Sequence, residues 1–206
     1  MPAQATAIGG CFVCWSRGKS GAGAAGDRGW AAAAVALGGR LVATSVVAGS
    51  AGAPYEAGLL ALREGPLLEQ AVRALDVKPD ALFVNATGRD HPRRAGLALH
   101  LGAVLRLPTA GVTHRLLVAE GRWPPDEAGA TSPIYLEGDV VGLWVRAREG
   151  TRPLAVHAGW RVDADAAAAL VLASLVGSRT PEPLREARRF AREARAAADV
   201  ETRRRL

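Results

Sequence analysis

Short apolar runs separated by polar and glycine-rich segments dominate the start of the chain. Ile8–Trp15 is one such run and predicts a strand, and residues 16–29, rich in Gly, Ala and Ser, predict a loop. Two further runs, Trp30–Leu37 and Leu41–Val47, flank a Gly-Gly pair. The alanines of the first of these would suit a helix by propensity. Two apolar runs joined by a glycine turn are typical of a β-hairpin, so the pattern favours strands.

Helical periodicity appears in several later segments. Leu59–Leu75 repeats apolar residues at helical spacing and predicts a helix. We expect a break near Glu64 and a new helical start at Pro66, because proline cannot donate a backbone hydrogen bond. Asp163–Leu175 predicts another helix, with Asp163 as its N-cap. Residues 183–206 mix Arg, Glu and Ala, which predicts a solvated surface helix followed by a basic tail.

The central part of the chain is predicted to run strand, loop, helix, strand. Ala81–Val84 is an apolar run long enough for one buried strand, and the polar loop after it begins at Asn85. Arg94–Leu105 has helical spacing, and Thr109–Val112 is a second apolar run. Open α/β sheets bind ligands where a strand ends in a polar loop before a helix. Asn85 and the loop residues up to His91 are therefore the first candidates for a site.

The order of the elements predicts the fold class. Asp139–Val145 and Pro153–Val156 are predicted strands, whereas residues 114–132 are irregular and contain prolines. A hairpin followed by alternating helices and strands indicates an α/β protein with a mixed central sheet and helices on both faces. The length of 206 residues suits a single domain that spans the whole chain, residues 1–206.

The charge of the chain favours an anionic partner but does not identify one. The formal net charge is +6 at pH 7 and the sequence pI is about 10.3, as in many nucleic-acid-binding proteins. Much of this charge lies in residues 185–205. The abundance of Ala, Gly and Arg is also what a GC-rich coding bias produces. Both interpretations remain open.

The only cysteines, Cys11 and Cys14, have the C-x-x-C spacing of redox and metal motifs. No second Cys or His pair has a matching spacing, and residues three apart on a strand point to opposite faces. We therefore predict buried structural thiols. No signal peptide and no membrane span is predicted, so we expect a cytoplasmic protein without a membrane partner.

A block of identities in the centre of the chain carries a family resemblance. It has the form GxxHPRRxGxAxHxG followed by PTxGV, and runs from Gly88 to Val112. It resembles endonuclease V, the nuclease that cuts near deoxyinosine. A second block, Pro54-Tyr55 and then Gly58–Glu64, is similar to the family's PYxPGxLxFRE segment. Weaker matches are residues 159–162 and 181–183, so the resemblance covers residues 8–190. It implies a ribonuclease H-like fold and also supports strands in the hairpin.

The resemblance implies a metal site that this chain lacks. Nucleases of this kind hold divalent metal with carboxylates from separate strands, because Mg²⁺ prefers hard oxygen ligands. The family's first-strand Asp falls on Phe12, its FRE glutamate on Glu64, its second Asp on Asn85 and its His on Trp160. The family's lysine after PTxGVA falls on His114. Of the four metal-site positions, only Glu64 keeps its type, so we predict no metal site.

Neighbouring polar residues are candidate replacements for the missing ligands. Asp90 occupies a loop position and would be able to point inward. His157, three residues before Trp160, is predicted to be a packed or exposed imidazole rather than a ligand. Asp165 is predicted to belong to a helix start.

The remaining candidates have a structural and a functional interpretation each. Tyr55 corresponds to the family's wedge segment, which separates bases near the lesion. His91 and His100 would cap and pack the central helix or serve the site. Arg93 and Arg94 would meet phosphate at the helix start or form structural pairs.

Three functions follow. The first is nucleic-acid binding without cleavage by an endonuclease V-like protein with a degenerate metal site, which is no longer a deoxyinosine nuclease. The second is metal-independent acid/base chemistry on a small planar organic ligand. The third is an active endonuclease with rearranged ligands, the only one that would need Mg²⁺ as a cofactor. If the protein is an enzyme, the candidate catalytic residues are Glu64, Asn85 and His91. The candidate substrate-binding residues are Phe12, Tyr55, Trp160, Arg93, Arg94 and His100.

Glu64 is the residue on which the hypotheses differ most. Rings at Phe12 and Trp160 beside this carboxylate would exclude water and raise its pKa, and Asn85 would hold one oxygen by a hydrogen bond. Alternatively, the rings plug the site and Glu64 pairs with Arg63 or Arg161.

Overall fold

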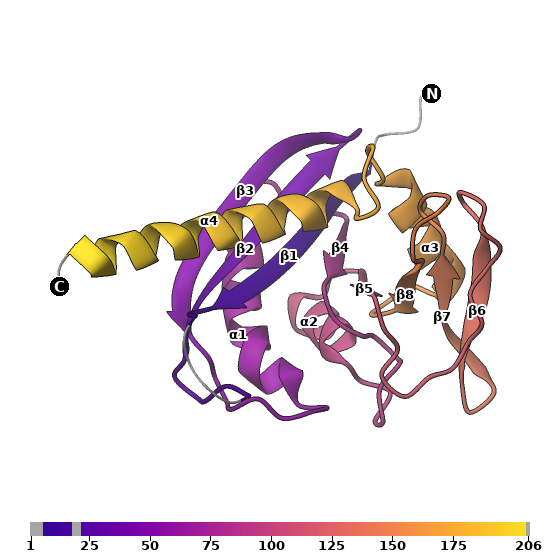
Figure 1. The fold of residues 1–206 in the computed structure, drawn as a ribbon, viewed down its shortest axis with the longest axis horizontal. Coiled ribbons are helices and arrows are strands. Elements are labelled where there is room, and N and C mark those ends of the chain that lie inside the picture. Colours follow the sequence, from indigo (N-terminus) through magenta and orange to yellow (C-terminus); the bar gives the residue numbers. More distant parts are fainter. Residues whose placement is uncertain (1–5, 18–21, 205–206) are drawn as a thin grey trace.

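An eight-stranded mixed sheet forms the centre of the molecule (Figure 1), in the strand order β3-β2-β1-β4-β5-β8-β7-β6. The computed structural model describes residues 6–17 and 22–204, without the side chain of Arg203. The strands are β1 (Ala7–Trp15), β2 (Arg28–Leu37), β3 (Arg40–Ser50), β4 (Ala81–Val84), β5 (Thr109–Thr113), β6 (Thr131–Leu136), β7 (Asp139–Val145) and β8 (Leu154–Ala158). The β1–β4 and β4–β5 pairs are parallel, and the other pairs are antiparallel. The predicted mixed sheet and the predicted hairpin of β2 and β3 are confirmed.

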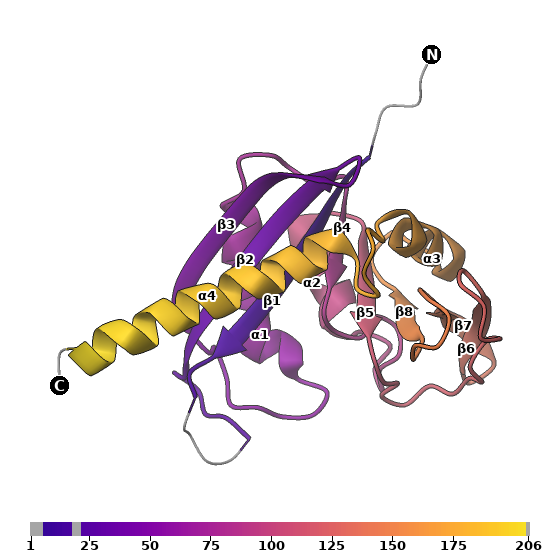
Figure 2. The same ribbon diagram turned by 45° about the horizontal axis from the view of Figure 1, so that its top comes forward.

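The helices cover both faces of this sheet, as predicted. They are α1 (Leu60–Arg73), α2 (Leu97–Leu105), α3 (Ala164–Ala173) and α4 (Glu182–Arg204). Apolar residues of α1 and α2 pack with one face of β1, β2 and β4. Residues of α3 and α4 pack on the opposite face. Figure 2 shows α4 crossing β1, β2 and β3 diagonally, with its C-terminal end beyond the edge of the sheet. Asp163 caps α3 by accepting a hydrogen bond from the backbone N–H of Ala166 (2.8 Å), which confirms the predicted N-cap.

The predicted break at Pro66 is wrong, because α1 continues through this residue. The backbone around Gly52 packs against the carbonyl groups that the proline disturbs. The Gly52 N–H donates to Arg63 O at 3.2 Å, and a Cβ at Gly52 would lie 2.5 Å from Leu62 O. Proline removes the helical bond to Leu62 O, and the neighbouring Arg63 carbonyl has an additional donor at Gly52, so this part of α1 is supported by a tertiary contact.

The start of α2 also differs from the prediction. The helix begins at Leu97 because Arg94 has a left-handed backbone conformation (φ 50°), which a helix does not accommodate. The N–H of Gly96 donates to Gly88 O at 2.8 Å and fixes the loop before the helix. Arg93 and Arg94 therefore lie in a loop and not in the first turn.

Strand β6 was missed in the sequence, where its first residues were assigned to an irregular segment. It contains Pro133 and forms one edge of the sheet, pairing with β7 along its length. An edge position tolerates proline, which lacks one ladder hydrogen bond. Because of this proline, the sequence did not predict the strand, which pairs with β7 in a hairpin.

Helix α4 is less solvated than predicted, because one side of it is buried on the sheet. Leu184, Ala187 and Ala191 are each at most 1% exposed. A Cβ at Gly10 would lie 2.4 Å from Leu184 N, so glycine lets the first turn of α4 rest directly on β1. The helix then extends past the end of β4. Among the described residues, no helix is both long and apolar enough to cross a membrane.

Candidate functional site

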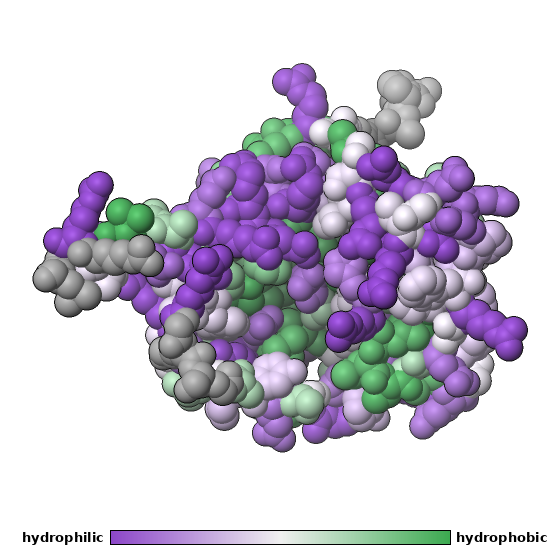
Figure 3. Space-filling view, in the orientation of Figure 1, coloured by the Kyte–Doolittle hydropathy of each residue, from purple (hydrophilic) through white to green (hydrophobic). Residues whose placement is uncertain are grey.

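The end of β4 leaves a notch in the sheet. Cys11 of β1 pairs with Val84, the last residue of β4, and β1 then continues to Trp15 without this neighbour. A cavity of about 270 Å³ lies here. We call it the β4 notch; it is lined by Phe12, Trp15, Tyr55, Glu64, Asn85 and apolar neighbours. The predicted adjacency of the two strands is confirmed, and it brings together Phe12, Glu64 and Asn85. On the face seen in Figure 3, the surface below the hydrophilic band of α4 is hollowed and lined with hydrophobic residues.

Glu64 projects from α1 into the notch, where Trp15 is its hydrogen-bond donor. Trp15 Nε1 donates to Glu64 Oε1 at 3.4 Å. Burial raises the pKa of Glu64 to about 7, and the Trp15 bond and the nearby Arg63 charge offset only part of this effect. The ring beside the carboxylate is therefore Trp15, and not Trp160 as expected.

This raised pKa predicts a pH-dependent stability. Between the unfolded pKa of 4.5 and the folded value of about 7, the folded state binds more protons, so the free energy of unfolding falls as pH rises through this window. At about 1.4 kcal/mol per pKa unit, the ionised carboxylate should cost roughly 3 kcal/mol above pH 7. Glu64→Gln should therefore be more stable than the wild type at pH 8 and nearly equal to it at pH 4. Urea denaturation at both pH values measures this, and a difference independent of pH would contradict it.

Arg63 does not neutralise Glu64. Its Nη2 forms an ion pair with Asp27 Oδ2 at 2.9 Å, and its guanidinium lies 4.5 Å from the centre of the Trp15 ring. Its Nη1 donates to the carbonyls of Ala24 and Ala53. The expected pairing of Glu64 with Arg63 is thus replaced by a buried ion pair that fastens the loop before β2. Arg161, the other expected partner, lies over the Trp160 ring at 5.8 Å.

The other two notch positions contact cations of α4. Asn85 Oδ1 accepts a hydrogen bond from Arg188 Nη2 at 3.1 Å. The guanidinium groups of Arg188 and Arg192 lie 5.2 and 5.8 Å from the centre of the Phe12 ring. Asn85 was expected to hold an oxygen of Glu64, and its amide oxygen instead faces a guanidinium.

This donor set does not fit a divalent cation. Phe12 offers no oxygen, and the amide oxygen of Asn85 is bonded to a positive group. Glu64 alone supplies a carboxylate, whereas Mg²⁺ needs several oxygen ligands. Within the described part of the chain, no three His, Cys, Asp or Glu side chains come together to form a metal site.

Trp160 lies away from the notch. Its backbone N–H donates to Thr109 Oγ1 at 3.0 Å, and its Cβ faces Gly102 at the end of α2. Thr109 is the first residue of β5, which runs parallel to β4, whereas Asn85 follows the last residue of β4. Trp160 therefore lies at the opposite end of these strands from Asn85. Its expected role in lining the site with Phe12 is therefore wrong.

The side chains of the HPRR loop make structural contacts, which is one of the two interpretations left open for its arginines. Arg93 N–H donates to His91 Nδ1 at 3.1 Å, which leaves His91 Nε2 as the donor to Gly58 O at 3.0 Å. Arg93 Nη2 donates to the same carbonyl at 2.7 Å. Arg94 pairs with two acidic side chains at the turn between β6 and β7, Glu137 and Asp139. His100 is exposed on α2 and lines neither the notch nor the cavity described next.

A second cavity of about 250 Å³ adjoins the notch. We call it the Tyr55 cavity; Tyr55, Leu60, Asn85 and Leu97 line both spaces. Thr87, His91 and Leu117 are among its other lining residues. Tyr55 is 49% exposed, so its ring is available to a molecule that binds from solvent.

Asp90 and His157 form a buried pair that sequence analysis did not recognise. Both side chains are 0% exposed, and Asp90 Oδ2 lies 3.8 Å from His157 Nδ1. Asp90 accepts hydrogen bonds from the backbone N–H groups of Leu117, Val118 and Ala119, each at 2.8 Å. Burial lowers the pKa of His157 to about 4, against the opposing effect of Asp90. The pair holds the loop after β5 and does not replace the missing metal ligands.

The cysteines behave as predicted. Cys11 packs in the apolar cluster with α1, whereas Cys14 packs on the α4 side and donates to Ala191 O at 3.2 Å. Both thiols are buried and free, and burial raises the pKa of each. The C-x-x-C spacing therefore places the two thiols on opposite faces of the sheet.

The mixed sheet, the helices on both faces and the notch at the end of β4 define a ribonuclease H-like α/β protein. The chain belongs to the endonuclease V family, whose model, described as Endonuclease V, matches residues 17–189. It is 42% identical over 158 residues to the endonuclease V of Methanopyrus kandleri, an alignment that covers 77% of this chain and 68% of that protein, about two thirds of its length. Residues 1–16, which include Phe12, lie outside the range matched by the family model.

Solved structures agree with this assignment. A crystal structure of endonuclease V from Streptomyces avermitilis has a TM-score of 0.86 and 33% identity, covering 97% of this chain and 85% of that chain. A structure of Ciona intestinalis endonuclease V in complex with a DNA containing an inosine has a TM-score of 0.79 and 21% identity, covering 96% and 88% of the two chains. Because the identity to this second structure is 21%, its similarity supports the fold alone.

Proposed function

We propose that this protein is an endonuclease V homologue that binds nucleic acid and does not hydrolyse it. One observation carries the proposal: the β4 notch contains a single carboxylate, Glu64, between an aromatic ring at Phe12 and an amide that faces Arg188. Phosphodiester hydrolysis in this class of site depends on metal that activates water and neutralises developing charge. The side chains of the notch supply neither the ligands nor the negative charge to hold such a metal.

The surface around the notch suits a nucleic acid. Tyr55 presents an exposed ring at the mouth of a cavity with apolar walls and a few polar groups. Such a ring can stack on a base, and positive groups beside it can follow the backbone. The inosine-containing DNA bound by the Ciona intestinalis protein supports this type of partner.

Rearranged ligands are not supported as an alternative. Asp90, one acidic candidate, is fully buried and accepts backbone hydrogen bonds. Asp163 is engaged as the N-cap of α3. Acid/base chemistry on a small planar molecule is the second candidate function. The observation that favours it is Glu64, whose pKa of about 7 suits proton transfer near neutral pH.

Binding of labelled oligonucleotides tests the proposal. We expect the protein to bind single- or double-stranded DNA or RNA in EDTA, with an affinity that falls steeply with salt because counterions are released. Tyr55→Ala should weaken binding by about 1–3 kcal/mol if one base stacks on the ring. Tyr135→Ala is the matched control, because Tyr135 is 40% exposed on the distant strand β6. Fluorescence anisotropy measures both, and an absence of salt-sensitive binding would favour the small-molecule candidate.

A further inference from the structure

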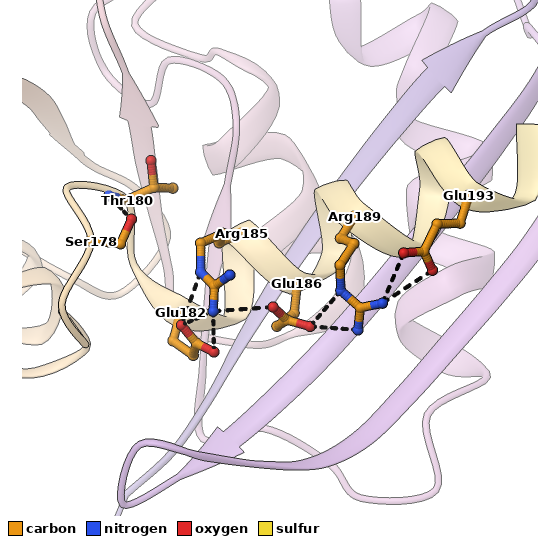
Figure 4. Close-up of polar contacts among 7 residues, drawn as sticks. All are labelled: Ser178, Thr180, Glu182, Arg185, Glu186, Arg189 and Glu193. Atoms are coloured by element: carbon orange, nitrogen blue, oxygen red, sulfur yellow. Dashed lines mark hydrogen bonds and ion pairs between the residues drawn. The ribbon is translucent and has the colours of Figure 1, made fainter. Parts of the chain in front are cut away.

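The arginines of α4 fall into two groups with different partners. Arg185 and Arg189 belong to a ladder of ion pairs along one side of the helix (Figure 4). Arg185 Nη2 lies 2.6 Å from Glu182 Oε1, and Arg189 Nη2 lies 2.7 Å from Glu186 Oε2. Arg189 also pairs with Glu193 at 2.9 Å. The positive charge of this group is therefore balanced within the helix.

Arg188 and Arg192 form the second group, which faces the β4 notch. Both guanidinium groups lie over the Phe12 ring, and Arg188 Nη2 donates a hydrogen bond to the amide oxygen of Asn85, which carries no charge. Arg188 Nε is buried and has no hydrogen-bond partner among the described residues. Within the same part of the chain, neither arginine has an ion pair with an acidic side chain.

Further positive groups surround Arg188. Its pKa is lowered, first by burial and then by the charges of Arg192 and Arg179. Arg179 Nη2 lies 3.5 Å from His114 Nδ1, and burial followed by Arg179 and Arg188 lowers the pKa of His114. Arg188 and Arg179 are partly buried, whereas Arg192 is exposed, and a partly buried cation without an acidic partner is costly unless an anion compensates it. The concentration of charge at this point indicates a site for an anion.

We propose that Arg188 and Arg192, together with Arg179, form a phosphate-binding cluster at the β4 notch, where relatives with an intact carboxylate set would hold metal. A planar guanidinium matches two phosphate oxygens, and stacking on Phe12 would leave its N–H edges free for this contact. Asn85 accepts from Arg188 through its oxygen, so its amide nitrogen can donate to a third oxygen. The inference deepens the proposed function, on which it rests, by naming the residues that receive the backbone phosphate.

Two measurements test the cluster. In the first, wild type, Arg188→Gln, Arg192→Gln and the double variant bind a labelled single-stranded oligonucleotide in EDTA over a range of salt concentrations. Each lost charge-assisted contact should weaken binding about tenfold. It should also reduce the log–log salt slope by about 0.7. Arg189→Gln is the control, because it removes the same charge from the balanced side of the same helix.

The second measurement follows the arginine Nε–H resonances of the wild-type protein by NMR while inorganic phosphate or chloride is added. Phosphate should shift the Arg188 and Arg192 signals, assigned by their loss in the Gln variants, and chloride at equal ionic strength should not. Comparing this titration with the oligonucleotide titration shows whether the cluster binds free phosphate, a nucleic-acid backbone or both.

The outcomes distinguish the two proposals. Oligonucleotide binding that is unchanged in the double variant would overturn the cluster and leave the proposed function intact. Arginine signals that move with phosphate in a protein that binds no oligonucleotide would support the cluster and overturn the proposed function. Signals that phosphate leaves unmoved would also overturn the cluster, whatever the oligonucleotide does.

Discussion

A duplex with a single deoxyinosine should remain intact after incubation with this protein and Mg²⁺ or Mn²⁺. The β4 notch offers one carboxylate, Glu64, where a metal-dependent nuclease needs several oxygen ligands. Losing a metal removes several kcal/mol of transition-state stabilisation, and about 1.4 kcal/mol corresponds to a factor of ten in rate. We therefore expect cleavage at least about a thousandfold slower than that of an endonuclease V with its carboxylates intact, by the same estimate. Denaturing electrophoresis of the labelled strand measures this.

The informative controls are substitutions in the notch itself. Metal-dependent nicking by the wild type that Glu64→Gln abolishes would contradict the prediction, whereas nicking that survives in Glu64→Gln indicates a contaminant. Phe12→Asp combined with Asn85→Asp restores two carboxylates beside Glu64. Calorimetry should then detect Mn²⁺ binding in this double variant and none in the wild type. The gain should be larger when Arg188→Gln is added, because the guanidinium next to Asn85 would compete with the metal for the new carboxylates.

Most of the central sheet could be predicted from the sequence, because its signals are local. The apolar run Ala81–Val84 coincides with β4, and Asp139–Val145 coincides with β7. The elements that were wrong depend on contacts distant in sequence. The helix α1 continues through Pro66 where the distant Gly52 donates to Arg63 O, and α2 starts late because of a left-handed residue in the loop before it.

The site was predictable in part for the same reason. Strand adjacency brings Phe12 and Asn85 together with Glu64, and the family resemblance marked all three positions. The predicted position of Trp160 was wrong, because a resemblance aligns residues without showing at which end of the strands they lie. The contribution of α4 was missed entirely, since the alternation of Arg and Glu along it does not reveal which arginines lack acidic partners. Arg188 is 103 positions from Asn85 in the sequence.

Replacing Arg63 should have the largest effect on stability, because its ion pair with Asp27 is buried. Its side chain is 4% exposed and that of Asp27 is 5% exposed, and the two form an ion pair at 2.9 Å. Arg63→Met would remove the guanidinium that pairs with the buried Asp27 carboxylate, together with the hydrogen bonds to the carbonyls of Ala24 and Ala53. Removing one partner of a buried pair typically costs about 3–5 kcal/mol. Urea denaturation at pH 7 should therefore show a loss of this size in the free energy of unfolding.

Arg73→Met on the same helix is the matched control for this prediction. Arg73 also has an acidic partner, Glu69 at 2.7 Å, but its side chain is 56% exposed, and such pairs contribute only about 0.3–0.5 kcal/mol. Adding Asp27→Asn to Arg63→Met removes the buried negative charge, so the double variant should lose less stability than the sum of the two single variants. Equal losses for Arg63→Met and Arg73→Met would show that the Arg63–Asp27 pair does not stabilise the fold. A large loss for Arg63→Met that Asp27→Asn partly restores would attribute it to the buried charge of Asp27 rather than to the missing arginine stem.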